Sequence, residues 1–272
     1  MDEIATVLLV GDLARPEFAE AVEQMRAACR VVEVDDPADA VSWCNRSEKP
    51  PALVVIASAL PGQWSDDAIE QLRRRLPLTP FVSLLGTWCE GEMRSGAPWP
   101  GAVRVYWHQW HQRFAREMAG IAAGQCGSWS LPVTASAEER LLSQTDAGQR
   151  HSRGVAAVVA DGREMAEWLV ATCRAHGWTT VWNSDWRSAE LQGADVVVWD
   201  VGPIEPAAFD ILQEIRDVFG DAPVVALTDF PRVEGQQQLT AAGAAAVLSK
   251  PLLVTDLAWQ LDRLAGRHFT RA

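Results

Sequence analysis

Four polar residues in the second half of the chain directly follow apolar runs that are typical of buried strands. Asp161 follows VAAVVA, Asp200 follows VVVW, Thr228 follows VVAL and Lys250 follows AAAVLS. If these strands lie parallel in one sheet, the four residues converge at its carboxyl edge. Neighbouring carboxylates repel unless a cation or proton lies between them, and hard oxygen ligands suit Mg²⁺. A lysine and a hydroxyl beside them can hold phosphoryl oxygens, so the set fits phosphoryl transfer onto an aspartate.

The elements that must position these residues alternate between apolar runs and amphipathic stretches, and both halves follow the same order. Predicted strands in the first half are 5–10, 31–34, 52–57, 81–85 and 103–107. Those in the second half are 154–160, 179–182, 195–199, 223–227 and 244–249. Apolar strands alternating with helices predict parallel sheets covered on both faces.

Five strands in about 120 residues are typical of the flavodoxin-like doubly wound class. We therefore predict an α/β protein with two (βα)5 sheets in tandem, each with strand order 2-1-3-4-5. The predicted domains are residues 1–125 and 153–272, and the polar, turn-rich segment 126–152 is predicted to be a linker.

Composition narrows the classes of protein to which the chain can belong. Its 272 residues are 48% hydrophobic and 22% charged, as in globular proteins. The net charge of −12 and the lack of a basic run argue against nucleic acid as a partner. No apolar stretch is long enough for a membrane span, and the acidic N-terminus differs from a signal peptide. Five scattered cysteines without a CxxC pair favour a reduced, cytoplasmic protein.

Residues 153 to about 268 resemble the receiver domains of bacterial two-component response regulators. The resemblance rests on four segments: VVADGRE (158–164), VVVWDVGP (196–203), VVALTDF (224–230) and GAAAVLSKPL (243–252). It implies that Asp200 is the phosphoacceptor. It also implies a Mg²⁺ site formed by Asp161, Asp200 and the backbone carbonyl of Gly202.

The same resemblance assigns the remaining polar residues. Thr228 is expected to move toward the phosphoryl group, and Lys250 to pair with Asp200, with a cis bond into Pro251. Two positions depart from the family pattern. Ala160 stands where receivers carry a second acid, which predicts weaker Mg²⁺ binding, and Val247 replaces the usual aromatic switch residue.

The first half resembles a pseudo-receiver, which keeps the fold and lacks the acceptor. In the same alignment Asp12 matches Asp161, and Ala57 takes the acceptor position. Leu85 falls opposite Thr228 and His108 opposite Lys250. A Gly- and Pro-rich segment, 90–101, replaces the fourth helix. The aromatic stretch 105–114 is either a core and its rim or an exposed recognition surface.

Two functions are compatible with these features. The first is a signalling protein that accepts a phosphoryl group on Asp200 from a histidine kinase or phosphotransfer protein, with at most slow self-dephosphorylation and no other enzymatic activity. Its output is expected through protein contacts or self-association at the faces of the fourth helix, fifth strand and fifth helix. The second is a non-catalytic scaffold that is not phosphorylated. A nucleotide-binding enzyme is disfavoured, because no GxGxxG follows a strand and no GxxxxGK[ST] occurs.

Overall fold

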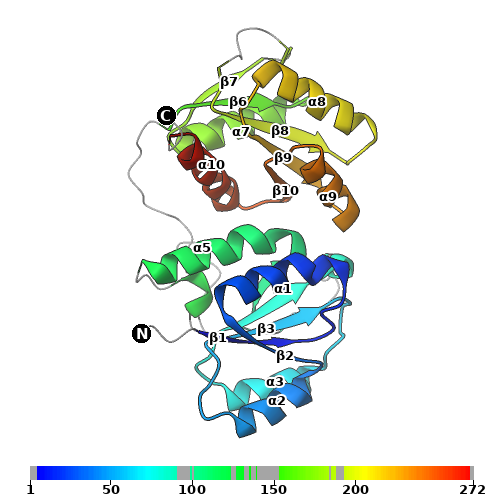
Figure 1. The fold of residues 1–272 in the computed structure, drawn as a ribbon, viewed down its shortest axis with the longest axis vertical. Coiled ribbons are helices and arrows are strands. Elements are labelled where there is room, and N and C mark those ends of the chain that lie inside the picture. Colours follow the sequence, from blue (N-terminus) through cyan, green and yellow to red (C-terminus); the bar gives the residue numbers. More distant parts are fainter. Residues whose placement is uncertain are drawn as a thin grey trace. The chain divides into compact units, whose positions relative to one another are not determined.

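The computed structural model describes residues 5–90, 99, 101–123, 127–131, 135, 139, 153–183, 185–187 and 193–269, without the side chains of 122 and 265–269. The chain divides into two compact units, Met1–Gln144 and Thr145–Ala272 (Figure 1). Most of the predicted linker (126–152) and of the segment 90–101 lies outside the described residues, as do residues 188–192 between two strands of the second unit.

Both units alternate strands and helices. The first unit contains β1 (Thr6–Val10), α1 (Pro16–Ala28), β2 (Arg30–Val34), α2 (Pro37–Arg46), β3 (Leu53–Ser58), α3 (Asp66–Arg75), β4 (Phe81–Leu85), η1 (Thr87–Cys89), β5 (Val103–Tyr106), η2 (Trp107–Gln109), α5 (Trp110–Ala122) and η3 (Ser128–Ser130). The second contains β6 (Val155–Val159), α7 (Arg163–Ala175), β7 (Thr179–Trp182), β8 (Val196–Gly202), α8 (Ala207–Phe219), β9 (Val224–Asp229), α9 (Val233–Ala241), β10 (Ala246–Lys250) and α10 (Val254–Phe269).

Each unit has one five-stranded sheet with parallel pairing throughout. The strand orders are β2-β1-β3-β4-β5 and β10-β9-β8-β6-β7. If the strands are numbered 1 to 5 within each unit and the sheets are read from β2 and from β7, both orders are 2-1-3-4-5. The predicted doubly wound fold is therefore confirmed for both units. In the first unit α1 and α5 cover one face of the sheet, and α2 and α3 the other (Figure 1).

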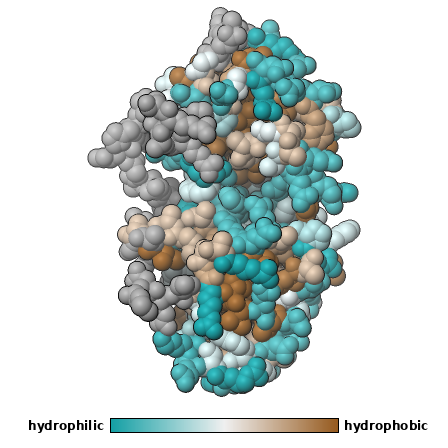
Figure 2. Space-filling model, viewed as in Figure 1, coloured by the Kyte–Doolittle hydropathy of each residue, from teal (hydrophilic) through white to brown (hydrophobic). Residues whose placement is uncertain are grey.

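The sheets are buried on both faces because their central strands are apolar throughout. Every residue of β3 is buried, and so are the first four of β8. In the second unit, residues of α7 and α10 pack on one face and residues of α8 and α9 on the other. On the side drawn in Figure 2, hydrophilic residues dominate the helix surfaces, with hydrophobic residues visible between them. No helix among the described residues is long and apolar enough to cross a membrane.

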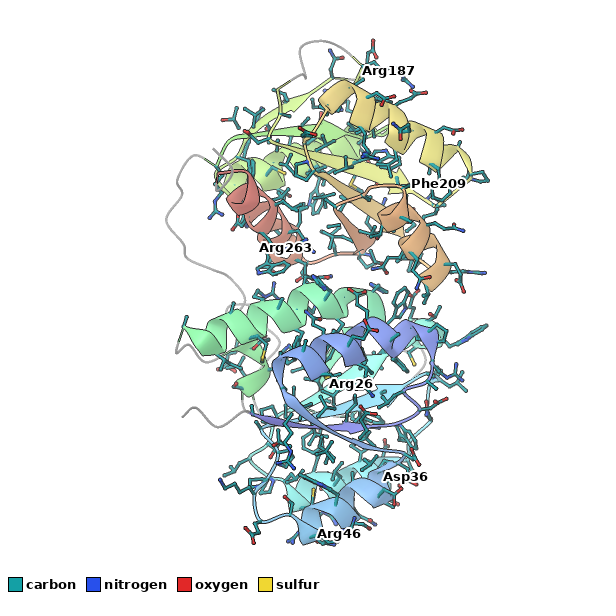
Figure 3. All side chains as sticks on the ribbon, viewed as in Figure 1. Arg26, Asp36, Arg46, Arg187, Phe209 and Arg263 are labelled. Carbon is teal, nitrogen blue, oxygen red and sulfur yellow. The ribbon has the colours of Figure 1, made fainter. Side chains whose placement is uncertain are left out.

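One helix of the first unit begins at a clear cap and has only a short apolar stripe. Helix α2 buries Ala40 and Cys44, together with Pro37 at its first turn. Asp36, labelled in Figure 3 at the start of this helix, accepts hydrogen bonds from the backbone N–H groups of Ala38 and Asp39. An Asp N-cap followed by Pro is a strong start signal, and it compensates for the short stripe.

The beginning of the predicted linker packs against α5. The carboxylate of Glu117, which is buried, accepts hydrogen bonds from the backbone N–H and the hydroxyl of Ser128 and, at 3.4 Å, from the N–H of Trp129. The Trp129 ring lies 5.5 Å from that of Trp110, which stacks on Phe114 at 5.3 Å. Trp110 and Phe114 are therefore core residues of the first unit rather than an exposed recognition surface.

We predict that Glu117→Ala destabilises the first unit by about 1–3 kcal/mol, because it leaves buried donors of Ser128 and Trp129 without their acceptor. Hydrogen-exchange mass spectrometry on the full chain at increasing urea would measure the change on peptides of α5. Glu70→Ala, which removes an exposed pair with Arg74 on α3, is the control and should change stability by less than about 0.5 kcal/mol. Equal effects of the two substitutions would contradict the anchoring role of Glu117.

Candidate functional site at the carboxyl edge of the second sheet

Asp200 and Lys250 meet at the carboxyl edge of the second sheet. Asp200 lies on β8 and Lys250 ends β10, with β9 between these two strands. The Lys250 Nζ donates to Asp200 Oδ1 at 2.5 Å, and each side chain is only 15% exposed. The bond between Lys250 and Pro251 is cis, as predicted. A charge-assisted hydrogen bond in this partly buried setting is stronger than one in water.

A second carboxylate, that of Asp229, binds the same lysine, although no role for it was predicted. Asp229 ends β9 in register with Lys250, and its Oδ1 lies 3.1 Å from Lys250 Nζ. Its side chain is 39% exposed. The signal was present in the sequence, because Asp229 directly follows Thr228 at the same strand end. One ammonium group therefore joins two carboxylates that would otherwise repel each other.

The pKa of Lys250 reflects a balance between burial and these two acids. Burial lowers the pKa, since a low-dielectric environment disfavours the charged form. Hydrogen bonds to Asp200 and Asp229, together with the charges of both carboxylates, raise it more. The pKa of Lys250 therefore lies above its ordinary value, and the side chain is a fixed positive charge at neutral pH.

Thr228 and Gly202 also meet at this edge. Thr228 is fully buried, and its hydroxyl donates to the Gly202 carbonyl at 2.9 Å. The pairing of β8 with β9 is irregular between Asp200 and Gly202, where one extra residue of β8 faces β9. Gly202 has a φ of 68°, which favours glycine. This bulge aims the Gly202 carbonyl at Thr228 and ends the regular strand just after Asp200.

Asp161 lies on the neighbouring strand end. In the pairing of β6 with β8, Val159 lies opposite Trp199. Asp161 comes two residues after Val159, and Asp200 comes one residue after Trp199. Asp161 is exposed in the loop before α7. Within the described ranges, no hydrogen bond or ion pair joins Asp161 to Asp200, Thr228 or Lys250, and no group of three His, Cys, Asp or Glu residues is placed to hold a metal.

The two residues that depart from the receiver pattern, Ala160 and Val247, both lie in apolar surroundings. Ala160 follows β6 and packs against the core cluster beneath α7 and α10. Val247 is buried in the opposite cluster, beneath α8 and α9. It pairs with Ala226 of β9, three residues before Lys250. No ring on β10 therefore accompanies Thr228.

The first unit has the same edge without the acceptor. Val10 pairs with Ile56 as Val159 pairs with Trp199, so Ala57 stands at the position of Asp200. Strand registers correct one sequence-based match. Leu84 pairs with Val105 as Leu227 pairs with Leu248, which places Trp107, and not His108, at the position of Lys250. The alignment without structure was one residue out because the aromatic run around it has no marker of where the strand ends.

His108 is buried beside an acid and two rings. Its Nε2 lies 3.4 Å from Glu90 Oε1, and its ring stacks on Tyr106 and meets Trp107 edge-on. Burial lowers the pKa of His108, and Arg113 adds to this effect, while the hydrogen bond and charge of Glu90 oppose it only in part. His108 is therefore neutral near pH 7 and cannot replace the fixed positive charge of Lys250.

Comparison with known proteins gives likenesses of fold. No protein-family model matches the chain, and no curated protein matches it. Response regulator receiver domains are among the solved structures found. A receiver domain protein from Clostridium thermocellum is 20% identical with a TM-score of 0.37, and the match covers 44% of this chain and 99% of that one.

Two further structures are similar to the same degree. The Francisella response regulator 1452 receiver domain is 20% identical with a TM-score of 0.36, over 42% of this chain and 98% of that one. The chemotaxis protein CheY4 of Vibrio cholerae is 24% identical with a TM-score of 0.36, over 41% of this chain and 98% of that one. The fold assignment itself stands on the strand orders and registers described above.

We predict that Asp200→Asn and Asp229→Asn both lower the pKa of Lys250, the first more than the second, because each removes a charge and weakens a hydrogen bond. Carbon-13 labelling of lysine and an NMR pH titration would measure this cleanly, since the chain contains only two lysines, Lys49 and Lys250. The Lys49 signal is the internal reference. A Lys250 titration that Asp229→Asn leaves unchanged would show that Asp229 does not hold the ammonium group.

We predict that the first unit loses stability as the pH falls below about 6.5, the ordinary histidine pKa. The unfolded chain binds a proton at His108 there, whereas the buried ring resists it, so the unfolded state is favoured. Hydrogen exchange on peptides of β4 and β5, in urea series at pH 7.5 and 5.5, would measure the loss in the full chain. His108→Gln should reduce the difference in stability between pH 7.5 and pH 5.5. If this difference is unchanged in the variant, other groups cause it.

Proposed function

We propose that the second unit accepts a phosphoryl group on Asp200 and acts as a receiver domain in two-component signalling. The observation that carries this proposal is the contact of 2.5 Å between Lys250 Nζ and Asp200 Oδ1. It joins an acid and a base on strands that flank β9, at the edge where Thr228 also lies. A lysine so placed neutralises charge on an acceptor oxygen and on a phosphoryl group bound to it.

In the proposed step, one carboxylate oxygen of Asp200 attacks the phosphorus of the donor. A phosphorus–oxygen bond forms, and the bond from phosphorus to the leaving group breaks, with its electron pair going to that group. Lys250 pairs with the negative charge around the new acyl phosphate. The Thr228 hydroxyl, which donates to Gly202 in this structure, rotates toward a phosphoryl oxygen.

The donor atoms at this edge fit Mg²⁺, which would supply charge neutralisation for the phosphoryl oxygens. Asp161, Asp200 and the Gly202 carbonyl are all oxygen ligands, as this hard cation requires. The Gly202 carbonyl already accepts from Thr228 but keeps a second lone pair. With only two carboxylates, such a site depends on several waters, a coordination that Mg²⁺ favours. Ala160 cannot contribute, so weak affinity is expected.

A histidine kinase or a phosphotransfer protein is the proposed phosphoryl donor. Output is proposed through protein contacts of the face formed by α9, β10 and α10, either with another protein or between copies of the chain. On this face Arg263, labelled on α10 in Figure 3, lies over the ring of Trp259 at 5.5 Å. Trp and Arg are the residue types that most often anchor protein interfaces.

The experiment that tests acceptance is a tryptophan-fluorescence titration with Mg²⁺ and then beryllofluoride, a phosphoryl mimic. We expect a saturable change in the wild type and none in Asp200→Asn. Lys250→Met should weaken beryllofluoride binding about tenfold or more, since it removes a charged hydrogen-bond donor. Trp199→Phe identifies the reporter, because Trp199 directly precedes Asp200 among thirteen tryptophans.

Acetyl phosphate gives an independent readout. Intact-mass measurement should detect one added phosphoryl group in the wild type and none in Asp200→Asn, with release of acetate. Circular dichroism must show that both proteins are folded. A folded wild type that responds to neither reagent at millimolar Mg²⁺ would refute the proposal and favour a non-catalytic scaffold, the function to which Ala160 and Val247 point.

A further inference from the structure

A pocket of about 330 Å³ opens on the α3 side of the first sheet, near its carboxyl edge. Its floor contains three polar residues of the three neighbouring strands β3, β4 and β5: Ser58, Ser83 and Arg104. Ser83 pairs directly with Arg104, and Ser58 pairs with Leu85, which also lines the pocket. In parallel strands paired residues share a face, so these side chains form one polar floor.

The second unit has an apolar floor at the same place. The registers match Ser83 with Ala226 and Arg104 with Val247, which are both apolar, and Ser58 with Gly202, which has no side chain. There α9 covers the sheet, and Leu239 of this helix belongs to the same buried cluster. The first unit therefore has polar residues bordering a pocket where the second unit has an apolar surface covered by α9.

Ser58 supplies the second observation that points to a ligand. Its side chain is buried, with 5% of the residue exposed, and its Oγ has no hydrogen-bond partner among the described residues. Its carbonyl is occupied, since it accepts from the backbone N–H of Gly86 and from the thiol of Cys89. A buried hydroxyl without a partner is unfavourable, and a ligand with an acceptor group would satisfy it.

The walls of the pocket are aromatic. The indole N–H of Trp64 donates to the Ala57 carbonyl at 3.0 Å, which fixes the ring beside the pocket. Trp99 lines the pocket as well, and both rings pack against the apolar core beneath α2 and α3. Indole faces favour stacking with a planar ring. The planar, positively charged guanidinium of Arg104 matches the geometry of a carboxylate.

From this combination we infer that the pocket binds a small planar aromatic acid. The ring lies between Trp64 and Trp99, and the acidic group reaches Arg104 and the hydroxyls of Ser58 and Ser83. A volume of about 330 Å³ is at the lower end of ordinary ligand pockets, which agrees with one ring system and a short acidic tail. The site is independent of phosphoryl acceptance on the second unit.

The test uses indole-3-acetate as the probe and indole-3-ethanol as its neutral counterpart. Calorimetry on the full chain should give saturable binding of the acid. The affinity for the alcohol should be lower by about tenfold or more. In nitrogen-15 NMR spectra of the tryptophan side chains, the indole signals of Trp64 and Trp99, assigned with Trp→Phe variants, should shift. Shifts confined to other tryptophans would overturn the assignment.

Variants that remove the polar groups of the floor sharpen the test. Ser58→Val and Arg104→Val should each weaken binding of the acid about tenfold, and Arg104→Met should do the same while keeping the aliphatic stem in place. Arg74→Met, on the exposed side of α3, is the matched control and should bind normally. The proposal is wrong if the folded wild type binds neither probe at millimolar concentration, or if folded Arg104→Met binds the acid as tightly as the wild type.

Discussion

Both sheets are buried on their two faces, and this constraint leaves the carboxyl ends of the strands as the main place where charged groups can meet. In the second unit the constraint brings Lys250 between Asp200 and Asp229, with β9 at the centre. The lysine offsets the repulsion of two acids, and the acids in turn keep it charged in spite of its burial. Removing Lys250 would leave two neighbouring carboxylates without the charge that offsets their repulsion, whereas removing either acid leaves the lysine paired with the other.

The fold was predictable because each strand is an apolar run with a clear end. Parallel pairing can then be predicted without further information, because apolar strands that alternate with helices leave few other topologies. The meeting of Asp200, Thr228 and Lys250 at one edge followed from the same reasoning. What the sequence could not supply was the detail of pairing: the bulge after Asp200 and the hydrogen bond from Thr228 to Gly202 depend on register, which composition does not encode.

The features that the sequence did not predict correctly also have physical causes. Asp229 was passed over because an acid after a strand is most often a turn residue, and only the register with Lys250 gives it a second role. Helix α2 is marked by its cap rather than by a long apolar stripe. His108 was matched to Lys250 because the aromatic run has no marker of where the strand ends, whereas strand pairing puts Trp107 there. For Asp229 and His108, a local pattern was outweighed by the pairing of strands that are distant in the sequence.

Comparing the two units position by position shows that the loss of the acceptor is one part of a wider change. Ala57 replaces the acceptor, and a neutral, buried His108 lies beside the position of the fixed positive charge. If the first unit were only a decayed copy, apolar floor residues would be expected to stay apolar, because a buried hydroxyl without a partner, such as that of Ser58, is costly. Instead Ser83 and Arg104 stand where the second unit has Ala226 and Val247, and Ser58 stands where it has Gly202. Polar residues that replace apolar ones beside a pocket are better explained by a new role than by the loss of an old one.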